Sequence, residues 1–284
     1  DDPEELDTAM GDTVVLGRVT PPQKRAMVQA LQRRGQVVGM TGDGVNDVLA
    51  LKRADMGIAM GSGSPATRAV ADLVLLDDRF DTLPSVLDEG RKVINNIERV
   101  SNLFVTKAVY AVLLAAIIGL QDVEFPLLPR HLTLIGTFSI GVPGFFLALA
   151  PNTELVRTGF LQRVLRFSIP AGIAAAVAAT LTYAIARADD QVDLDEARTA
   201  TAIALLAVGL VILVVVSRPL RAWKVGLAAA MGASYTAVMV IDPLQEFFRL
   251  SPPPTSVWGP MVLVIAGCSA MVLAIPAVNR RMSG

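Results

Sequence analysis

Cysteine, aromatic residues and net charge are all scarce in this chain of 284 residues. The one cysteine, Cys268, excludes an intrachain disulfide and a cysteine-rich metal site. Aromatic residues make up 5% of the chain, so its apolar segments are built mainly from Ala, Val, Leu and Ile. The formal net charge of −1 gives no electrostatic basis for nucleic-acid binding, and we expect no nucleic-acid partner.

A secretory signal is lacking as well. The chain opens with the acidic run Asp1–Glu5, whereas a signal peptide begins with basic residues and an apolar core. The first residue is not Met, so we expect the chain to be a piece of a longer protein. What the sequence does contain is apolar: hydrophobic residues make up 53% and the mean hydropathy is +0.53, which is typical of membrane proteins.

Residues 1–82 have the pattern of a small α/β domain in which short apolar runs alternate with helical spacing of apolar residues. The alternation predicts a parallel sheet with covered faces, that is, a Rossmann-like fold. The candidate strands are 13–17, 36–40, 56–60 and 73–76. The candidate helices are 23–34, 48–53 and a short helix opened by the Gly-Ser-Gly-Ser-Pro run at 61–65, whereas 1–11 is polar and predicted to be irregular.

A long helix is predicted over 83–120, because no strong helix breaker follows Gly90. Its first part is charged and its second part is apolar, so 83–102 is predicted to be a stalk that enters a bilayer. Residues 103–284 are then an all-α transmembrane domain of six helices, each near the roughly 20 residues that cross a membrane. The six predicted spans are 103–120, 132–150, 167–186, 197–216, 222–241 and 257–278.

The charges between these spans alternate in sign. Basic residues follow spans two, four and six, whereas the segments after spans one, three and five are acidic or mixed. By the positive-inside rule, we expect the N-terminal region and the C-terminus to be cytoplasmic and the protein to lie in a bacterial plasma membrane. The alternative of a soluble all-α core is weak, because the predicted spans hardly have a polar face. The basic residues are Arg157, Arg163, Arg166, Arg218, Arg221, Lys224, Arg280 and Arg281, and the acidic ones include Asp122, Glu124 and Asp189.

The string MTGDGVND at 40–47 follows a candidate strand and has the residues that magnesium and a phosphoryl group need. Asp43 offers a hard anionic oxygen to Mg²⁺, and Asn46 and Asp47 could orient the surroundings. Lys24 could neutralise phosphoryl oxygens from its helix. The glycines allow close approach of the backbone, so the candidate cofactor-binding positions are Thr41, Gly42 and Gly44. The alternative to a phosphate site is that Asp43–Asp47 form an ordinary turn and that Lys24 is a solvated lysine on its helix.

This string and the residues after it, up to Gly61, resemble the hinge motif of the P-type cation-transporting ATPases, which belong to the haloacid-dehalogenase-like superfamily. Residues 17–24 resemble the conserved-lysine segment of that family, 71–78 the end of its phosphorylation domain and 90–97 the start of its stalk. The resemblance implies that Asp43 binds the catalytic Mg²⁺, that Asn46 and Asp47 orient the phosphoryl site, and that Lys24 contacts the phosphoryl group.

The family is phosphorylated by ATP on the aspartate of a DKTGT motif, and it uses a TGE motif for dephosphorylation; neither motif occurs here. The resemblance therefore implies the C-terminal half of a pump whose remaining polypeptide binds most of the ATP. We expect the chain by itself not to turn over ATP. The chain resembles bacterial members of the family in general, which implies a metal cation as substrate, with calcium as the leading candidate.

Polar residues inside the predicted spans are candidates for the ion path, because such groups are costly in a membrane. They are Thr106 and Lys107 in span one and Thr137, Ser139, Gly141 and Pro143 in span two. The Gly-Val-Pro-Gly run at 141–144 is predicted to interrupt its helix and free carbonyls for a cation, although such kinks can also serve packing.

Acidic side chains are lacking at depth in spans one and two. Calcium and sodium–potassium pumps of the family carry acids at the positions of Ala111 and Ile140, so hydroxyls and carbonyls are the expected ligands here. Lys107 could be an internal counter-charge or could extend to the cytoplasmic surface. His131 is predicted to be a polar residue at the membrane interface.

Three hypotheses remain at this point: an ATP-driven cation pump, a membrane-tethered phosphatase of the same superfamily, and a non-catalytic membrane scaffold. The continuous stalk and the Gly-Val-Pro-Gly run favour the pump over the phosphatase. The presence together of Lys24, Asp43, Asn46 and Asp47 favours it over the scaffold.

Overall fold

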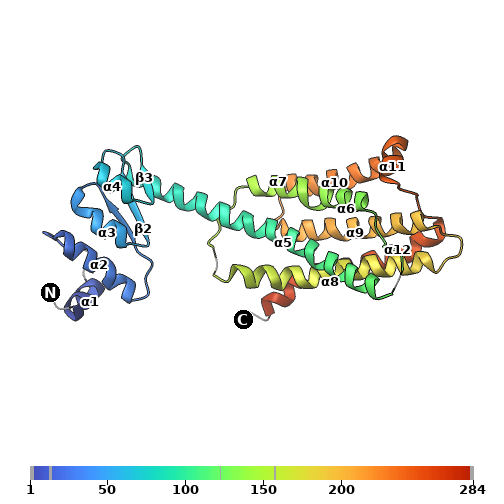
Figure 1. Ribbon diagram of the computed structural model, residues 1–284, viewed down its shortest axis with the longest axis horizontal. Coiled ribbons are helices and arrows are strands. Elements are labelled where there is room, and N and C mark those ends of the chain that lie inside the picture. The colour runs from blue at the N-terminus through green and yellow to red at the C-terminus, as the bar shows by residue number, and fades with distance from the viewer. Residues whose placement is uncertain (1–2, 13–14, 122, 157, 282–284) are drawn as a thin grey trace. The chain divides into compact units, whose positions relative to one another are not determined.

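The computed structural model describes the chain except for residues 1–2, 13–14, 122, 157 and 282–284 (Figure 1). The chain divides into two compact units, Asp1–Leu87 and Asp88–Gly284, and each is described by itself. The described residues form an α/β unit and a set of long apolar helices, as the sequence predicts. Two of the charges used to predict the membrane orientation, Asp122 and Arg157, lie outside the described residues.

The sheet of the first unit has three parallel strands in the order β1 (Gly39–Gly42), β2 (Met56–Met60) and β3 (Leu73–Leu75). Thr41 pairs with Ile58, and Ala59 pairs with Val74. Because all three strands are parallel, their carboxyl ends lie at one edge of the sheet, where α/β folds bind ligands.

Short helices connect and cover these strands: α1 (Pro3–Asp12), α2 (Pro21–Arg33), α3 (Val48–Arg53) and α4 (Pro65–Val70). Helix α2 begins after Thr20, whose backbone N–H donates to Gln23 Oε1 at 2.9 Å, and prolines occupy its first turn, where their missing N–H is not needed. Val28, Val38 and Ala50 form the buried apolar cluster between α2, β1 and α3.

Three predictions for this unit are wrong in part. Residues 3–12 form helix α1 rather than an irregular segment, because Arg33 of α2 holds the Asp7 carboxylate at 2.6 Å. In the predicted strand 13–17, residues 13–14 lie outside the described part, and 15–17 are not a strand because they have no sheet partner. Strand β1 begins at Gly39 and continues to Gly42, because its register with β2 runs from Met56 to Ala59.

The second unit contains most of helix α5 (Leu83–Gln121), a single helix of 39 residues that confirms the predicted polar-to-apolar helix. Five of the described helices are long and apolar enough to cross a membrane, and a sixth span results if a bent pair counts as one. The further elements are α6 (Pro129–Gly136), a π-helical segment (Thr137–Gly141), α7 (Val142–Leu149), α8 (Phe160–Arg187), α9 (Leu194–Val216), α10 (Ala222–Val240), α11 (Asp242–Phe248) and α12 (Thr255–Arg281).

Small residues let these helices pack closely. Helix α8 buries a row of alanines, and its Gly172 faces α5 so tightly that a Cβ there would lie 2.5 Å from the Cβ of Val109. Gly209 of α9 packs against Ser139 in the same way, with 3.2 Å between the Ser139 Cβ and the position of a Cβ on the glycine. Close backbone approach through small residues is the usual way for membrane helices to associate.

The Gly-Val-Pro-Gly run does not unwind its helix, so that prediction is wrong in form. The backbone widens into a π-helical turn over Thr137–Gly141, where the Val142 N–H reaches back to the Thr137 carbonyl. Pro143 then falls at the start of α7, directly after the wide turn, which accommodates a residue without an N–H inside the helix. The span is therefore continuous from α6 to α7, with a wide turn inside it.

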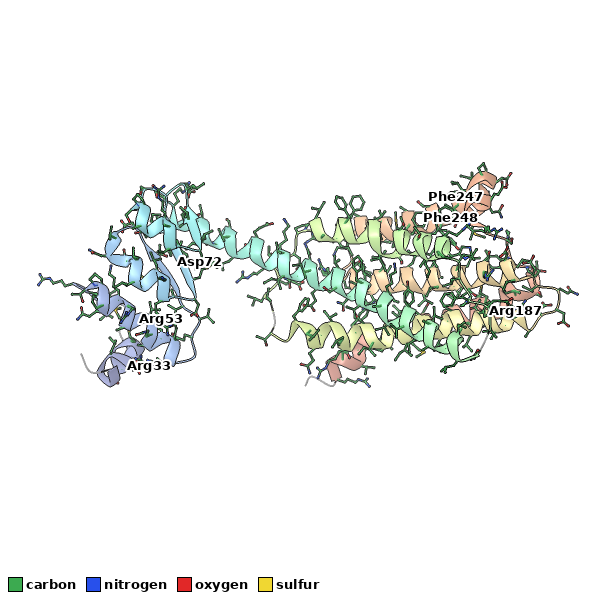
Figure 2. All side chains as sticks on the ribbon, viewed as in Figure 1. Arg33, Arg53, Asp72, Arg187, Phe247 and Phe248 are labelled. Atoms are coloured by element: carbon green, nitrogen blue, oxygen red, sulfur yellow. The ribbon has the colours of Figure 1, made fainter. Side chains whose placement is uncertain are left out.

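A sharp bend of 92° separates α10 from α11 at Ile241, next to Asp242 and Pro243. Phe247 and Phe248 at the end of α11 stack edge to face, with ring centroids 5.0 Å apart (Figure 2).

Candidate functional site

The turn after β1 gathers the residues of the phosphate-site prediction. Thr41 and Gly42 end the strand, and Asp43 follows with an exposed side chain at the carboxyl edge of the sheet. Gly44 precedes a short 3₁₀ turn over Val45–Asp47. In that turn Asn46 is exposed, whereas Asp47 is buried.

Lys24 of α2 pairs with Asp47. The Lys24 ammonium donates to Asp47 Oδ1 at 2.6 Å; the Asp47 side chain is 8% exposed and that of Lys24 34% exposed. The pair ties α2 to the end of the turn across 23 positions of sequence. An ammonium has three donors, so this lysine keeps donors for a further anion while it holds Asp47.

Gly42 is required by this arrangement. A Cβ at position 42 would lie 2.5 Å from the Asp47 Cβ and 2.8 Å from its carboxylate carbon, closer than any side chain can pack. The absence of a side chain at Gly42 therefore lets the Asp47 carboxylate lie against the strand end, where Lys24 reaches it.

A second loop, 61–67, supports the turn from beside it, and the sequence interpretation assigned it no role in the site. The Ser64 N–H donates to the Asp43 carbonyl at 2.8 Å, and the Thr67 hydroxyl donates to the Gly44 carbonyl at 2.8 Å. Gly63 is needed here, because a Cβ on it would lie 2.9 Å from the Asp43 carbonyl oxygen. In the sequence, the Gly-Ser-Gly-Ser-Pro pattern indicates a loop here, but only the fold shows that this loop lies beside Asp43.

The same loop is anchored on its other side by Asp78. The backbone N–H of Ser62 donates to the Asp78 carboxylate at 2.9 Å, and this bond together with the Ser62 side chain holds the pKa of Asp78 below its ordinary value. The loop is thus fixed at both ends, which keeps the backbone around Asp43 in place.

The turn offers one carboxylate that is available to coordinate Mg²⁺, that of Asp43. The Asp43 carboxylate is exposed and has no hydrogen-bond partner in the described part of the chain, whereas Asp47 is held by Lys24. No group of three or more His, Cys, Asp or Glu side chains that could hold a metal occurs among the described residues. Mg²⁺ often uses one or two carboxylates and completes its shell with phosphate oxygens and water, so a single Asp43 suits it.

The ion-path candidates lie on several helix faces and do not form one cluster. Thr106 on α5 is buried with an unpaired hydroxyl, and its carbonyl lies toward Gly172 of α8. The Ser139 hydroxyl is buried and donates to the Ile135 carbonyl at 2.7 Å. Of the others, Thr137 and Gly141 are exposed on the span, and Pro143 is buried.

Comparison with known proteins covers both units. The family model for haloacid dehalogenase-like hydrolases matches residues 25–87. The calcium-transporting ATPase CtpE of Mycolicibacterium smegmatis is 49% identical over 263 residues, which cover 88% of this chain and 33% of that protein. CtpE of Mycobacterium tuberculosis is 47% identical over 87% of this chain and 33% of that protein. The probable cation-transporting ATPase exp7 of Streptococcus pneumoniae is 33% identical over 272 residues, which cover 92% of this chain and 35% of that protein.

The chain belongs to the P-type cation-transporting ATPases. It spans about a third of the length of these relatives. The match to CtpE includes the membrane helices as well as the α/β unit, and the described spans make this an integral membrane protein.

Lys107 of this P-type ATPase chain lies inside the helix assembly. Its side chain is half-buried, and its ammonium is 3.0 Å from the position that a Cβ on Gly136 would occupy. Gly136 ends α6 beside the π-helical turn, so the ammonium sits between the first two spans.

His131 is fully buried by protein in the first turn of α6, and its level relative to the membrane interface stays a prediction. Its Nε2 lies 3.0 Å from the Phe248 carbonyl, which can only accept, so Nε2 carries the proton. The other ring nitrogen accepts from the Leu128 N–H at 3.4 Å. His131 therefore ties the start of α6 to the end of α11, and Arg130 adds a bond to the Phe247 carbonyl at 2.6 Å.

Proposed function

We propose that the complete protein is an ATP-driven cation pump that couples Mg²⁺-dependent turnover of an aspartyl phosphate to cation transport across a bacterial plasma membrane. The observation that carries the proposal is the turn at the edge of the sheet, where the Lys24–Asp47 pair and the 61–67 loop hold Asp43 exposed. This turn belongs to a chain whose similarity to CtpE continues through the membrane helices, which favours a pump over a tethered phosphatase or a scaffold.

The roles of the chain's own residues follow from their positions. Asp43 would hold Mg²⁺, which when bound offsets the charge of the phosphoryl oxygens. Lys24 would donate its remaining N–H groups to the same phosphoryl group. Asp47 holds the Lys24 ammonium in place. Asn46 is exposed, so its amide would be available for a polar contact with the phosphoryl group. Glycines in the backbone of Thr41–Gly44 would let the phosphoryl group approach closely. The phosphorylated aspartate and most of the ATP site belong to the remainder of the pump.

We propose the following division for coupling. Residues 1–82 form the end of the phosphorylation domain, 83–102 the stalk and 103–284 the transmembrane part, with the N-terminal region and the C-terminus cytoplasmic. Helix α5 begins at Leu83, at the end of the α/β unit, and is continuous to Gln121, so a displacement at its start would reach the level of Thr106 and Lys107 through one helix.

Calcium is the proposed cation. Support comes from the names of the two CtpE relatives, which are 49% and 47% identical to this chain. The candidate ligands in this chain, which lie on different helix faces, are the buried hydroxyls of Thr106 and Ser139 and the carbonyls of the π-helical turn. Ca²⁺ accepts hydroxyl and carbonyl oxygens, although carboxylates from the remaining polypeptide would be needed for tight binding.

The test is ATP-driven calcium uptake by the complete protein in inverted membrane vesicles. Asp43→Ala is expected to abolish uptake and ATP hydrolysis, because the variant loses the Mg²⁺ ligand. Asp77→Ala is the matched control, since Asp77 is an exposed carboxylate of the same unit outside the turn. Normal ATP hydrolysis in Asp43→Ala would contradict the pump assignment, and ATP hydrolysis without calcium stimulation in the unaltered protein would contradict the choice of ion.

A further inference from the structure

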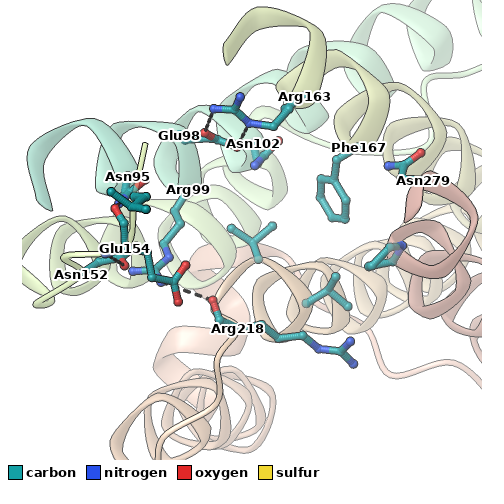
Figure 3. A pocket seen from close by; sticks show the side chains of 14 residues that line it. Asn95, Glu98, Arg99, Asn102, Asn152, Glu154, Arg163, Phe167, Arg218 and Asn279 are labelled. Carbon is teal, nitrogen blue, oxygen red and sulfur yellow. Dashed lines mark hydrogen bonds and ion pairs between the residues drawn. The ribbon is translucent and has the colours of Figure 1, made fainter. Parts of the chain in front are cut away.

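A cavity of about 790 Å³ lies within the second unit, among α5, α8, α9, α12 and the segment after α7 (Figure 3). None of the residues given a role in phosphoryl transfer or ion binding lines it. It is formed by the start of α8 and the ends of α9 and α12, so it lies at one end of the helix assembly. This is the end where the chain's basic residues gather, and it is therefore at the level of lipid headgroups.

The walls of the cavity are polar toward the helix ends and mainly apolar one turn further in, where Asn102 of α5, bonded to Ser168, is the polar residue of the lining. On α8, Arg163 is followed one turn deeper by Phe167, which Figure 3 shows beside the cavity. At the end of α9, Arg218 is preceded one turn deeper by Val215, and Pro276 adds an apolar surface from α12. A ligand that filled this space would have a polar end and an apolar end.

The charges at the polar level leave an excess of positive charge. Arg163 and Glu98 neutralise each other through two hydrogen bonds of 3.0 and 2.6 Å. Arg99 is 8% exposed and donates to the Arg218 carbonyl at 3.3 Å, as the dashed line in Figure 3 marks. Glu154 is the second carboxylate in the lining, so its three guanidinium groups (Arg99, Arg163 and Arg218) exceed its two carboxylates (Glu98 and Glu154) by one positive charge.

Arg218 is the residue with free binding capacity. It is exposed, and its guanidinium has no hydrogen-bond acceptor in the described part of the chain. A guanidinium binds a phosphate group through two parallel N–H donors, which makes it suited to a phosphate-bearing ligand. Arg218 lies two residues after the end of α9 and lines the cavity together with Val215 and Val216.

We propose that this cavity binds an anionic phospholipid, with its phosphate at Arg218 and the first part of its acyl chains against Phe167, Val215 and Val216. The volume falls within the roughly 300–1,000 Å³ of ordinary ligand sites, enough for a headgroup and the adjoining methylenes. A free phosphate ion would leave the apolar level in water, whereas a lipid covers both levels. Because α5 lines the same cavity through Asn95 and Asn102, a bound lipid links α5 to α8 and α9.

The experiment is native mass spectrometry of the complete protein in mild detergent, titrated with phosphatidylglycerol or phosphatidylcholine. We expect phosphatidylglycerol to bind more tightly and Arg218→Ala to weaken its binding about fivefold, which corresponds to the roughly 1 kcal/mol of one arginine near an anionic membrane surface. Arg221→Ala is the matched control: it removes the same charge from the same loop, but Arg221 does not line the cavity. This control is expected to bind phosphatidylglycerol as the unaltered protein does.

A second variant and a second ligand separate a lipid from a free anion. Val216→Trp narrows the apolar part of the cavity without changing its charge. We expect this variant to bind phosphatidylglycerol more weakly. The effect of added inorganic phosphate on lipid binding should be the same as in the unaltered protein. Equal binding of the two lipids would overturn the proposal, as would equal effects of Arg218→Ala and Arg221→Ala. Full displacement of the lipid by inorganic phosphate at concentrations equal to that of the lipid would also overturn it, because the cavity would then recognise the anion alone.

Discussion

The ammonium of Lys24 and the carboxylate of Asp47 lie 2.6 Å apart, and this contact joins helix α2 to the turn that presents Asp43. The acid is buried and the lysine is one-third exposed. The pair therefore has a structural role that is separable from any contact between Lys24 and a phosphoryl group.

Removal of the lysine should destabilise the turn. Lys24→Met leaves the Asp47 carboxylate buried without its partner, and we expect a local loss of about 1–3 kcal/mol, less than for a fully buried pair because Lys24 is partly in water. Hydrogen exchange of the β1 and α2 amides, followed by mass spectrometry, measures this loss. The control is Lys24→Met combined with Asp47→Asn, which removes the unpaired charge and should restore part of the protection. Equal exchange in the single and double variants would show that the unpaired Asp47 charge is not the cause of the loss, and exchange in Lys24→Met equal to that of the unaltered protein would show that the pair contributes nothing.

Substitution of Gly42 by alanine should lower the local stability of the turn, whereas the same substitution of Gly39 in the same strand should not. A Cβ at Gly42 would lie 2.5 Å from the Asp47 Cβ, whereas a Cβ at Gly39 would meet no atom within 4 Å. We expect Gly42→Ala to lose about 1–3 kcal/mol of local stability, as overpacking does. The same exchange experiment measures it, and Gly39→Ala is the control that should change little. Equal protection in the two variants would contradict the close packing at the turn.

Acid should loosen the link between α2, β1 and β2 at Asp55. The Val38 N–H donates to the Asp55 carboxylate at 2.9 Å and Gln32 donates at 3.1 Å, and these bonds lower the pKa of Asp55 below its ordinary value of 3.8. Because the folded-state pKa is the lower one, the stabilisation is fully present above pH 3.8 and is lost as the pH falls through the folded-state value. Exchange rates at Val38, measured against pH, should rise in that range, and Asp55→Asn should remove the dependence. An unchanged pH dependence in Asp55→Asn would assign the effect to other carboxylates.

Much of the fold follows from local patterns that need no distant partner. Strand Met56–Met60 and helix Val48–Arg53 have the bounds that the sequence predicts, because apolar runs and helical spacing are read within a few residues. The same is true of the long helix from Leu83, where the change from charged to apolar residues is continuous. Residues 3–12 and the start of β1 do not follow from local pattern, because the ion pair to Arg33 and the register with β2 depend on distant parts of the chain.

By itself, the sequence determined the type of protein: the MTGDGVND string, the long apolar runs and the lack of acids in the first two spans are all properties of contiguous residues. Only the tertiary structure decided that Lys24 pairs with Asp47, that the 61–67 loop supports Asp43, that Lys107 turns toward Gly136 and that Gly-Val-Pro-Gly widens a helix instead of breaking it. Each of these depends on which segments pack together in space, and the free energy of such contacts between distant residues is not expressed in any local pattern.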